Sequence, residues 1–364
     1  MRIKLKQIPI LPVLVIIALL TIALLSLYSL LSSGYMKSYI IKQITRIATG
    51  FGVMYLVLLL NLNIFKKYAY LLYIGCVLML VIVAIMGRTA MGAQRWLDLY
   101  YISIQPSEMM RIALIIVLAK YFSQINNEDI SKVLYLIFPN ILVLVPVGLV
   151  LQQPDLGTAM LLLLVYFSIL FIIGVEIWKL LFVPACGLVL SPIIWQHLHE
   201  YQQNRILMFL MPEKDPNGSG YHIIQSKIAI GSGGMWGQGF MKGSQCQLNF
   251  LPEKHNDFIF AAIGEEFGFI GCISLIGLYL ILLIYNYNVA IQTKNKFYKY
   301  LVFGLNAMFF FYLFINISMV CGLLPVVGIP LPFVSYGGSA LVVLMFSEAI
   351  IMSVAINNKT LTKY

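Results

Sequence analysis

The sequence predicts an all-α polytopic membrane protein with about ten transmembrane helices. Of its 364 residues, 61% are hydrophobic and only 10% are charged, and its mean hydropathy is +0.91. Soluble domains typically carry about 25% charged residues. Long apolar runs also recur along the whole chain, and a helix needs about 20 such residues to cross the hydrocarbon core of a bilayer. We therefore expect a single integral-membrane domain over residues 1–364.

Ten apolar runs are long enough to span. They cover roughly 9–31, 44–63, 68–87, 106–124, 133–151, 157–175, 178–197, 257–285, 300–322 and 338–357. The first run follows a short basic segment, but it is too long for the core of a signal peptide and has no small-residue cleavage site, so we interpret it as a retained span. The gap at about 198–256 is a long loop between spans 7 and 8.

Basic residues indicate the orientation. The net charge of +10 does not predict a nucleic-acid partner, because the Lys and Arg residues lie in short clusters between the apolar runs and form no basic stripe. The positive-inside rule explains these clusters, and an even number of spans puts both termini on one side, here the cytoplasmic side. The five cysteines show no paired spacing, so no disulfide framework follows.

This orientation places the most polar segments between the spans at the outer face. They are 88–108, 151–158, the end of the long loop near 250–258, and the Gly/Pro-rich stretch 322–338. These segments are distant in sequence but reach the same face of the membrane. We therefore expect them to form one extracytoplasmic site.

Asp257 is the sharpest candidate for chemistry in this site. It follows His255 and opens an apolar helix, and an ionisable group at the rim of a membrane is a functional candidate by default. It can be an N-cap, a general base with a partly desolvated carboxylate, or both. Glu253 is either a second carboxylate facing the same space or a solvated loop charge. His255 is a proton shuttle, a metal ligand or neither.

Other charged residues have both a structural and a functional interpretation. Glu108 and Arg111 lie three residues apart at a helix start. They form either a local ion pair or a site in which Arg111 holds a phosphate or carboxylate. Asp155 is a turn or cap residue, or a metal-binding or anion-repelling group. Arg88 and Arg95 either attract a pyrophosphate or lie at the headgroup level in an aromatic belt.

Six motifs resemble those of the SEDS family of membrane proteins and occur in the family order. They are RWLDL (95–99), QPSE (105–108), QQPDLGT (152–158), IAIGSGGMWGQG (228–239), FLPEKHNDFIFAAIGEEFGFIG (250–271) and GIPLPFVSYGGSAL (328–341). The resemblance covers essentially the whole chain, and it is closer to the RodA branch of the family than to the FtsW branch. No P-loop, nucleophile elbow or HExxH motif is present in the sequence.

The resemblance implies a peptidoglycan glycosyltransferase. Such an enzyme polymerises lipid II into glycan strands at the outer face of the bacterial inner membrane, during cell elongation and cell-shape maintenance. The essential acid of the family's HTDF motif falls on Asp257, the general base expected for an inverting transfer. The resemblance and the charge pattern together suggest a set of substrate-binding residues: Glu108, Arg111, Asp155, Glu253, His255, Arg88, Arg95 and Ser335. The family's SExxK motif reads SEMMR here, which leaves the role of Arg111 open.

The expected ligands and partners follow from the same resemblance. They are lipid II and undecaprenyl-linked glycan, a class B penicillin-binding protein that cross-links the strands, and other membrane proteins of the elongation complex. A divalent cation, Mg or Mn, could compensate the leaving pyrophosphate with Asp257 as a candidate ligand, and no nucleotide is expected. The alternatives are a lipid II flippase and a non-catalytic scaffold for the penicillin-binding protein. The residues leave open the metal, the donor and acceptor grooves, the partner surface and activity without a partner.

Overall fold

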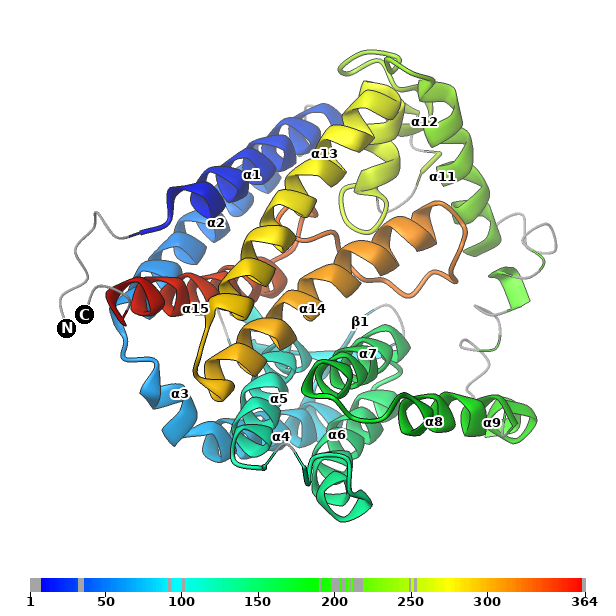
Figure 1. The fold of residues 1–364 in the computed structure, drawn as a ribbon. Coiled ribbons are helices and arrows are strands. Elements are labelled where there is room, and N and C mark those ends of the chain that lie inside the picture. Colours follow the sequence, from blue (N-terminus) through cyan, green and yellow to red (C-terminus); the bar gives the residue numbers. More distant parts are fainter. Residues whose placement is uncertain are drawn as a thin grey trace.

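The apolar runs form helices in the computed structural model of the chain (Figure 1). The structure describes residues 8–31, 36–90, 93–99, 102–126, 128–189, 191–197, 203, 207–209, 211, 219–248, 250–251 and 254–361. The helices are α1 (Ile10–Leu30), α2 (Met36–Leu59), α3 (Asn63–Lys67), α4 (Ala69–Met86), α5 (Pro106–Ser123), α6 (Val133–Gln152), α7 (Leu156–Ile173), α8 (Ile177–Val189), α9 (Ser191–His197), α11 (Ser219–Gly233), α12 (Ser244–Gln247), α13 (Ile259–Gln292), α14 (Lys296–Val320) and α15 (Ser339–Leu361).

Seven helices in the described part of the chain are long and apolar enough to cross a membrane, which makes this a multi-pass membrane protein. They are α1, α4, α6, α7, α13, α14 and α15. The other three expected spans coincide with helices that fall short on length or composition. Helices α2 and α5 carry several charged residues, and the run at 178–197 forms two short helices, α8 and α9, of 13 and 7 residues.

The middle of the bundle is formed by α5, α14 and α15. Almost every residue of α5 is buried, including Glu108 and Arg111, and α15 is buried over most of its length. The outer helices expose large apolar side chains: Leu71 on α4 is 65% exposed and Leu134 on α6 is 75% exposed. Such a surface is unusual for a soluble protein and is expected where lipid tails are the solvent.

A small antiparallel sheet departs from the predicted all-α class. The strands β1 (Arg88–Ala90), β2 (Ala93–Leu99) and β3 (Ile102–Ile104) pair in the order β1-β2-β3. The register places Arg88 opposite Trp96 and Leu97 opposite Ile104. The sequence interpretation treated 88–108 as a polar loop with an aromatic belt. The sheet pairs backbone groups that an irregular loop would leave without such partners.

Helix α13 is interrupted at Gly268, whose φ of 65° and ψ of −161° are not helical. The interruption frees the carbonyls of Glu265 and Glu266, which accept hydrogen bonds from the amides of Gln238 (2.9 Å) and Gly239 (3.0 Å). The turn after α11 therefore fills the gap in α13. The Glu265 carboxylate also accepts from the first amides of α12, at 2.7 and 3.0 Å. The glycine-rich part of the long loop is thus anchored to the bundle, as half-apolar irregular backbone requires.

Candidate functional site

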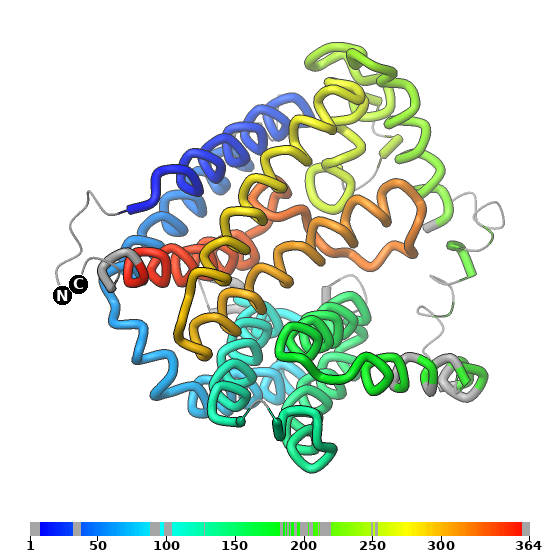
Figure 2. Tube along the Cα trace, in the orientation of Figure 1, coloured from blue at the N-terminus to red at the C-terminus, as the bar shows by residue number. Residues whose placement is uncertain are grey.

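Segment 321–338 runs from the end of α14 back along the bundle to α15 (Figure 2) and links two groups of polar side chains. A Cβ on Gly157, in the first turn of α7, would lie 2.7 Å from the carbonyl oxygen of Val327. A Cβ on Gly328, whose φ is +74°, would lie 3.4 Å from Oδ2 of Asp257. Glycines at 157 and 328 therefore allow the backbone of this segment to pass between the start of α7 and Asp257.

The first group is a buried charged cluster between α5, α7 and α14. Arg111 donates from Nη1 to Glu108 at 2.8 Å and from Nη2 to the Thr158 hydroxyl at 2.6 Å. Tyr312 donates its phenol to Glu108 at 2.8 Å. The Glu108 and Arg111 side chains are each 4% exposed, so this is no surface ion pair. The two charges compensate each other, which is what allows both to be buried.

Asp155 joins the same cluster and caps α7. Its carboxylate accepts from the Thr158 amide at 3.2 Å and from the Thr158 hydroxyl at 2.8 Å, so the cap interpretation is confirmed. Arg95 on β2 lies 3.8 Å from this carboxylate and also donates to the carbonyl of Pro154. Gln105 approaches Asp155 at 3.5 Å. The RWLDL, QPSE and QPDLGT motifs thus meet in one place.

The second group surrounds Asp257. Helix α13 begins at Ile259, so Asp257 lies just before the N-cap position. The side chain of Asn316 on α14 donates to the carbonyls of Asp257 (3.0 Å) and Ile329 (2.7 Å), and so ties the Asp257 loop to segment 321–338. The Ser335 hydroxyl donates to the Asn256 carbonyl at 2.7 Å and accepts from the Leu331 amide at 2.7 Å. These bonds hold the backbone on both sides of the carboxylate.

Helix α14 connects the two groups, because Tyr312 and Asn316 are four residues apart and so lie on one face of that helix. Tyr312 reaches Glu108 and Asn316 reaches the backbone of Asp257. Sequence reasoning missed both residues, along with Thr158. A polar residue inside an apolar run was the available signal.

An aromatic cluster covers His255. Its ring lies 5.6 Å from that of Tyr39 on α2 and 5.9 Å from that of Tyr336, and the Tyr336 amide donates to the His255 carbonyl at 2.9 Å. Arg46 on α2 lies over the Tyr336 ring at 4.4 Å. The neighbouring Lys254 donates to the Cys246 carbonyl, and partial burial lowers the pKa of its ammonium group.

The remaining predicted site residues lie outside what the structure describes. Glu253 is not among the described residues, and for Arg88 only its backbone in β1 is described. The residues that the structure does describe contain no group of three His, Cys, Asp or Glu side chains placed to hold a metal. They therefore do not form an all-protein metal site. Mg²⁺ often binds through one carboxylate and substrate phosphates, so the cation stays a prediction.

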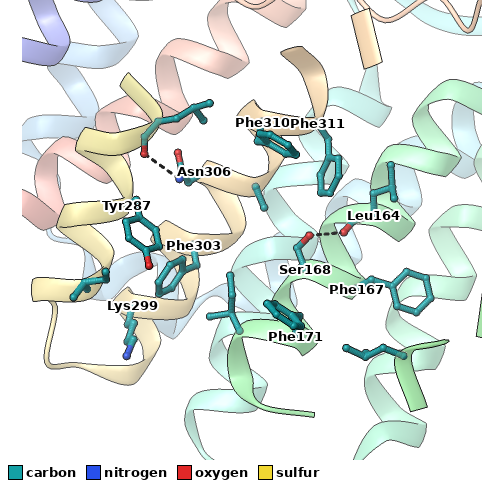
Figure 3. Close-up of a pocket in the computed structure, with 15 residues that line it drawn as sticks. Leu164, Phe167, Ser168, Phe171, Tyr287, Lys299, Phe303, Asn306, Phe310 and Phe311 are labelled. Carbon is teal, nitrogen blue, oxygen red and sulfur yellow. Dashed lines mark hydrogen bonds between the residues drawn. The ribbon is translucent and has the colours of Figure 1, made fainter. Parts of the chain in front are cut away.

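A groove with a mostly apolar lining lies apart from both polar groups. It has a volume of about 840 Å³ and lies between α7 on one side and α13 and α14 on the other (Figure 3). Phe167, Phe171 and Phe310 line it, and Lys299 lies at one end. Its lining on α14 extends from Lys299 to Phe311, whereas Asn316 lies nearer the end of that helix. Its lining is mostly apolar, and its polar side chains are Ser168, Tyr287, Lys299 and Asn306.

Apolar helices surround the two polar groups, which lie near helix ends. This arrangement defines a polytopic membrane protein with a polar site built at the ends of its helices. The family described as "Cell cycle protein" (FtsW/RodA/SpoVE) matches residues 6–360 of this chain. The peptidoglycan glycosyltransferase MrdB of Escherichia coli strain K12 is 44% identical over 331 residues, which cover 88% of this chain and 87% of that protein. The MrdB protein of Helicobacter pylori is 39% identical over 315 residues, covering 84% and 80%.

Solved structures agree with the sequence comparison. A chain from the structure described as "Structural coordination of polymerization and crosslinking by a peptidoglycan synthase complex" superposes with a TM-score of 0.83 at 29% identity, covering 96% of this chain and 98% of that one. The rod shape determining protein RodA of Thermus thermophilus superposes with a TM-score of 0.71 at 26% identity, covering 94% and 95%. The chain belongs to the FtsW/RodA/SpoVE family, and the predicted SEDS resemblance is confirmed.

Proposed function

We propose that this protein is a peptidoglycan glycosyltransferase that polymerises lipid II into glycan strands during cell elongation. Relatives that carry the name peptidoglycan glycosyltransferase align with this chain over more than four fifths of its length. Within the site, the observation that carries the proposal is the position of Asp257. Its carboxylate faces a backbone segment that, on its other side, approaches Gly157 in the first turn of α7, next to the buried Glu108–Arg111–Asp155 cluster.

The protein lies in the bacterial inner membrane with ten spans, both termini in the cytoplasm and the site at the outer face. In addition to the seven helices that meet the criteria for a span, α2, α5 and the α8–α9 pair then also cross. The start of α1 and the end of α15 lie toward the same end of the bundle (Figure 1), which supports an even number of crossings. Burial of α5 inside the bundle explains how a charged helix can cross, because its charges contact protein and not lipid.

The reaction is an inverting transfer between two lipid-linked sugars. The 4-hydroxyl oxygen of the acceptor GlcNAc attacks C1 of the donor MurNAc, and its proton passes to the Asp257 carboxylate. The bond from C1 to the pyrophosphate oxygen breaks, and undecaprenyl pyrophosphate leaves with the bonding electron pair. General base catalysis by a positioned carboxylate contributes about 10²–10⁴ in rate.

The charge on the leaving pyrophosphate needs a cationic partner. Arg111 and Arg95 are candidates, but each already faces a carboxylate: Glu108 at 2.8 Å and Asp155 at 3.8 Å. The two arginines therefore act on the pyrophosphate through the electrostatic field of the whole cluster. Glu108 and Asp155 keep both arginines in place. His255 and Ser335 hold the loop through their backbone and hydroxyl contacts.

A class B penicillin-binding protein is the partner that cross-links the new strands. The similarity to a chain from a structure described as a peptidoglycan synthase complex supports this assignment. Other membrane proteins of the elongation complex are further expected partners.

Polymerisation of fluorescent lipid II tests the function. The purified chain, in complex with its class B partner, is incubated with the substrate and moenomycin, which silences contaminating classical glycosyltransferases. Wild type is expected to give glycan ladders, and Asp257→Asn is expected to lose activity by at least about a hundredfold, because the amide cannot accept the proton. Glu128→Gln, the same change at an exposed carboxylate between α5 and α6, is the matched control and keeps full activity.

Two outcomes would contradict the proposal. Ladders of equal intensity from wild type and Asp257→Asn would exclude Asp257 as the general base. No ladders from either protein, in a well-folded complex, would favour the flippase or the scaffold.

A further inference from the structure

Helix α2 carries a polar stripe along the face that packs against α15. Tyr39, Gln43 and Arg46 follow one another at helical spacing, and Gly50 continues the same face. A Cβ on Gly50 would meet Met345 of α15 at 2.2 Å, so this face is in close contact with its neighbour. Gln43 and Gly50 are buried and Tyr39 and Arg46 are half-buried, so the stripe faces the bundle.

The stripe reaches the loop that carries Asp257. The Tyr39 ring lies 5.6 Å from the His255 ring and 5.1 Å from the Tyr336 ring. The Arg46 guanidinium lies over Tyr336 at 4.4 Å and beside Gly338, where an added Cβ would be 3.4 Å from its Nε. Arg46 is thus two contacts away from His255, through Tyr336, and His255 precedes Asp257 by two residues in the chain.

Polar atoms of this stripe are buried without a partner. The Gln43 side chain is 1% exposed, and neither its oxygen nor its nitrogen makes a hydrogen bond within the described part of the chain. Nη1 of Arg46 is likewise buried and unbonded there. None of the ion pairs among the described residues involves Arg46. Burying such groups costs free energy unless a ligand completes them.

We propose that Gln43 and Arg46 bind phosphate oxygens of a polyprenyl-linked pyrophosphate next to Asp257. A guanidinium offers two parallel donors to a phosphate, and the Gln43 amide adds a further donor on the same helix face. Unlike Arg95 and Arg111, Arg46 brings a positive charge with no carboxylate partner among the residues described. The inference rests on the proposed function, and it assigns the anion of the substrate to α2.

Binding of undecaprenyl pyrophosphate, measured by native mass spectrometry on the purified full chain, tests this assignment without turnover. Arg46→Gln is expected to weaken binding by about tenfold to a hundredfold, the effect of losing a charged hydrogen bond. Gln43→Leu is expected to weaken it by about tenfold. Lys42→Gln removes a charge from an exposed position of the same helix and is expected to change binding by less than about twofold.

Thermal unfolding separates a binding role from a structural one. Gln43→Leu is expected to keep or raise the unfolding temperature, because it replaces an unpartnered buried amide by an apolar side chain of similar size. Arg46→Lys keeps the charge and is expected to bind better than Arg46→Gln. A sharp fall in the unfolding temperature of Gln43→Leu, or equal binding by Arg46→Gln and Lys42→Gln, would overturn the proposal.

The anion has two lipid sources, and a competitor distinguishes them. A hundredfold excess of phosphatidylglycerol is expected to leave undecaprenyl pyrophosphate bound. Its displacement would make this a general phospholipid site and overturn the substrate assignment. Arg46-dependent binding by a protein that makes no glycan would refute the proposed function and leave this inference standing.

Discussion

Arg111 stands where the family motif usually has lysine, and its contacts explain what the guanidinium does here. Two of its nitrogens donate to different partners, Glu108 and Thr158, on two different helices. A lysine carries a single nitrogen on a flexible stem and cannot hold both partners in the same fixed geometry. At this position the side chain links α5 to α7 as well as neutralising Glu108.

Removing this charge is expected to destabilise the protein. Arg111→Met leaves Glu108 buried without its cation, which costs about 3–5 kcal/mol of unfolding free energy. Arg111→Lys is expected to lose less, because the positive charge remains. Lys120→Met removes a charge from the other end of α5, where the contact to the Lys67 carbonyl is solvent-exposed, and is the control. Thermal unfolding in detergent measures all three, and equal effects of Arg111→Met and Lys120→Met would contradict the buried-pair argument.

At the scale of an element, the interruption of α13 determines where the long loop is attached. Gly268 has a backbone conformation that essentially only glycine adopts. A Cβ there would also lie 2.3 Å from the Gly237 amide nitrogen, inside the turn that fills the gap in the helix. The two glycines are therefore required together, one for the break and one for the turn that packs into it.

A strained backbone conformation costs about 1–3 kcal/mol of unfolding free energy. Gly268→Ala is expected to destabilise the protein by more than this, because the clash with Gly237 adds to the strain. Gly277→Ala lies on the same helix, has helical backbone and places its Cβ in open space, so it is expected to cost nothing. Size-exclusion chromatography after heating compares the two variants. If both retain the same fraction of folded protein, the break at Gly268 is not needed.

At the scale of the whole molecule, the solvent explains why so much could be predicted. Lipid requires backbone hydrogen bonds within each segment, so apolar runs had to become helices, and seven of the ten expected spans coincide with helices that are long and apolar enough to cross. The convergence of QPSE, QPDLGT and RWLDL also followed from topology, since alternate loops share a face. Tertiary details did not follow. The seven-residue strand β2 is too short for its alternation of side chains to be recognised in the sequence. A cation at the start of α2 resembles a residue at the membrane interface, so the sequence does not show that it reaches into the bundle.

The number of crossings gives a prediction that separates ten spans from seven. Ten spans with the N-terminus inside put Lys67 and Lys132 in the cytoplasm and the highly exposed Trp236 outside. If α2, α5 and the α8–α9 pair did not cross, Lys67 would lie outside and Trp236 inside. An odd instead of an even number of spans would then precede Lys67, and an even instead of an odd number would precede Trp236. Lys132 would stay inside in both arrangements and serves as the internal control.

Single cysteines report these sides directly. Lys67→Cys, Lys132→Cys and Trp236→Cys are placed in a chain whose five native cysteines are replaced. Intact spheroplasts are treated with a membrane-impermeant maleimide before and after permeabilisation. Only Trp236→Cys is expected to react in intact cells, and the two lysine positions only after permeabilisation. Labelling of Lys67→Cys in intact cells would mean that α2 lies along the membrane. Since α2 carries Tyr39, Gln43 and Arg46, that result would also mean that the polar stripe does not lie in the membrane interior.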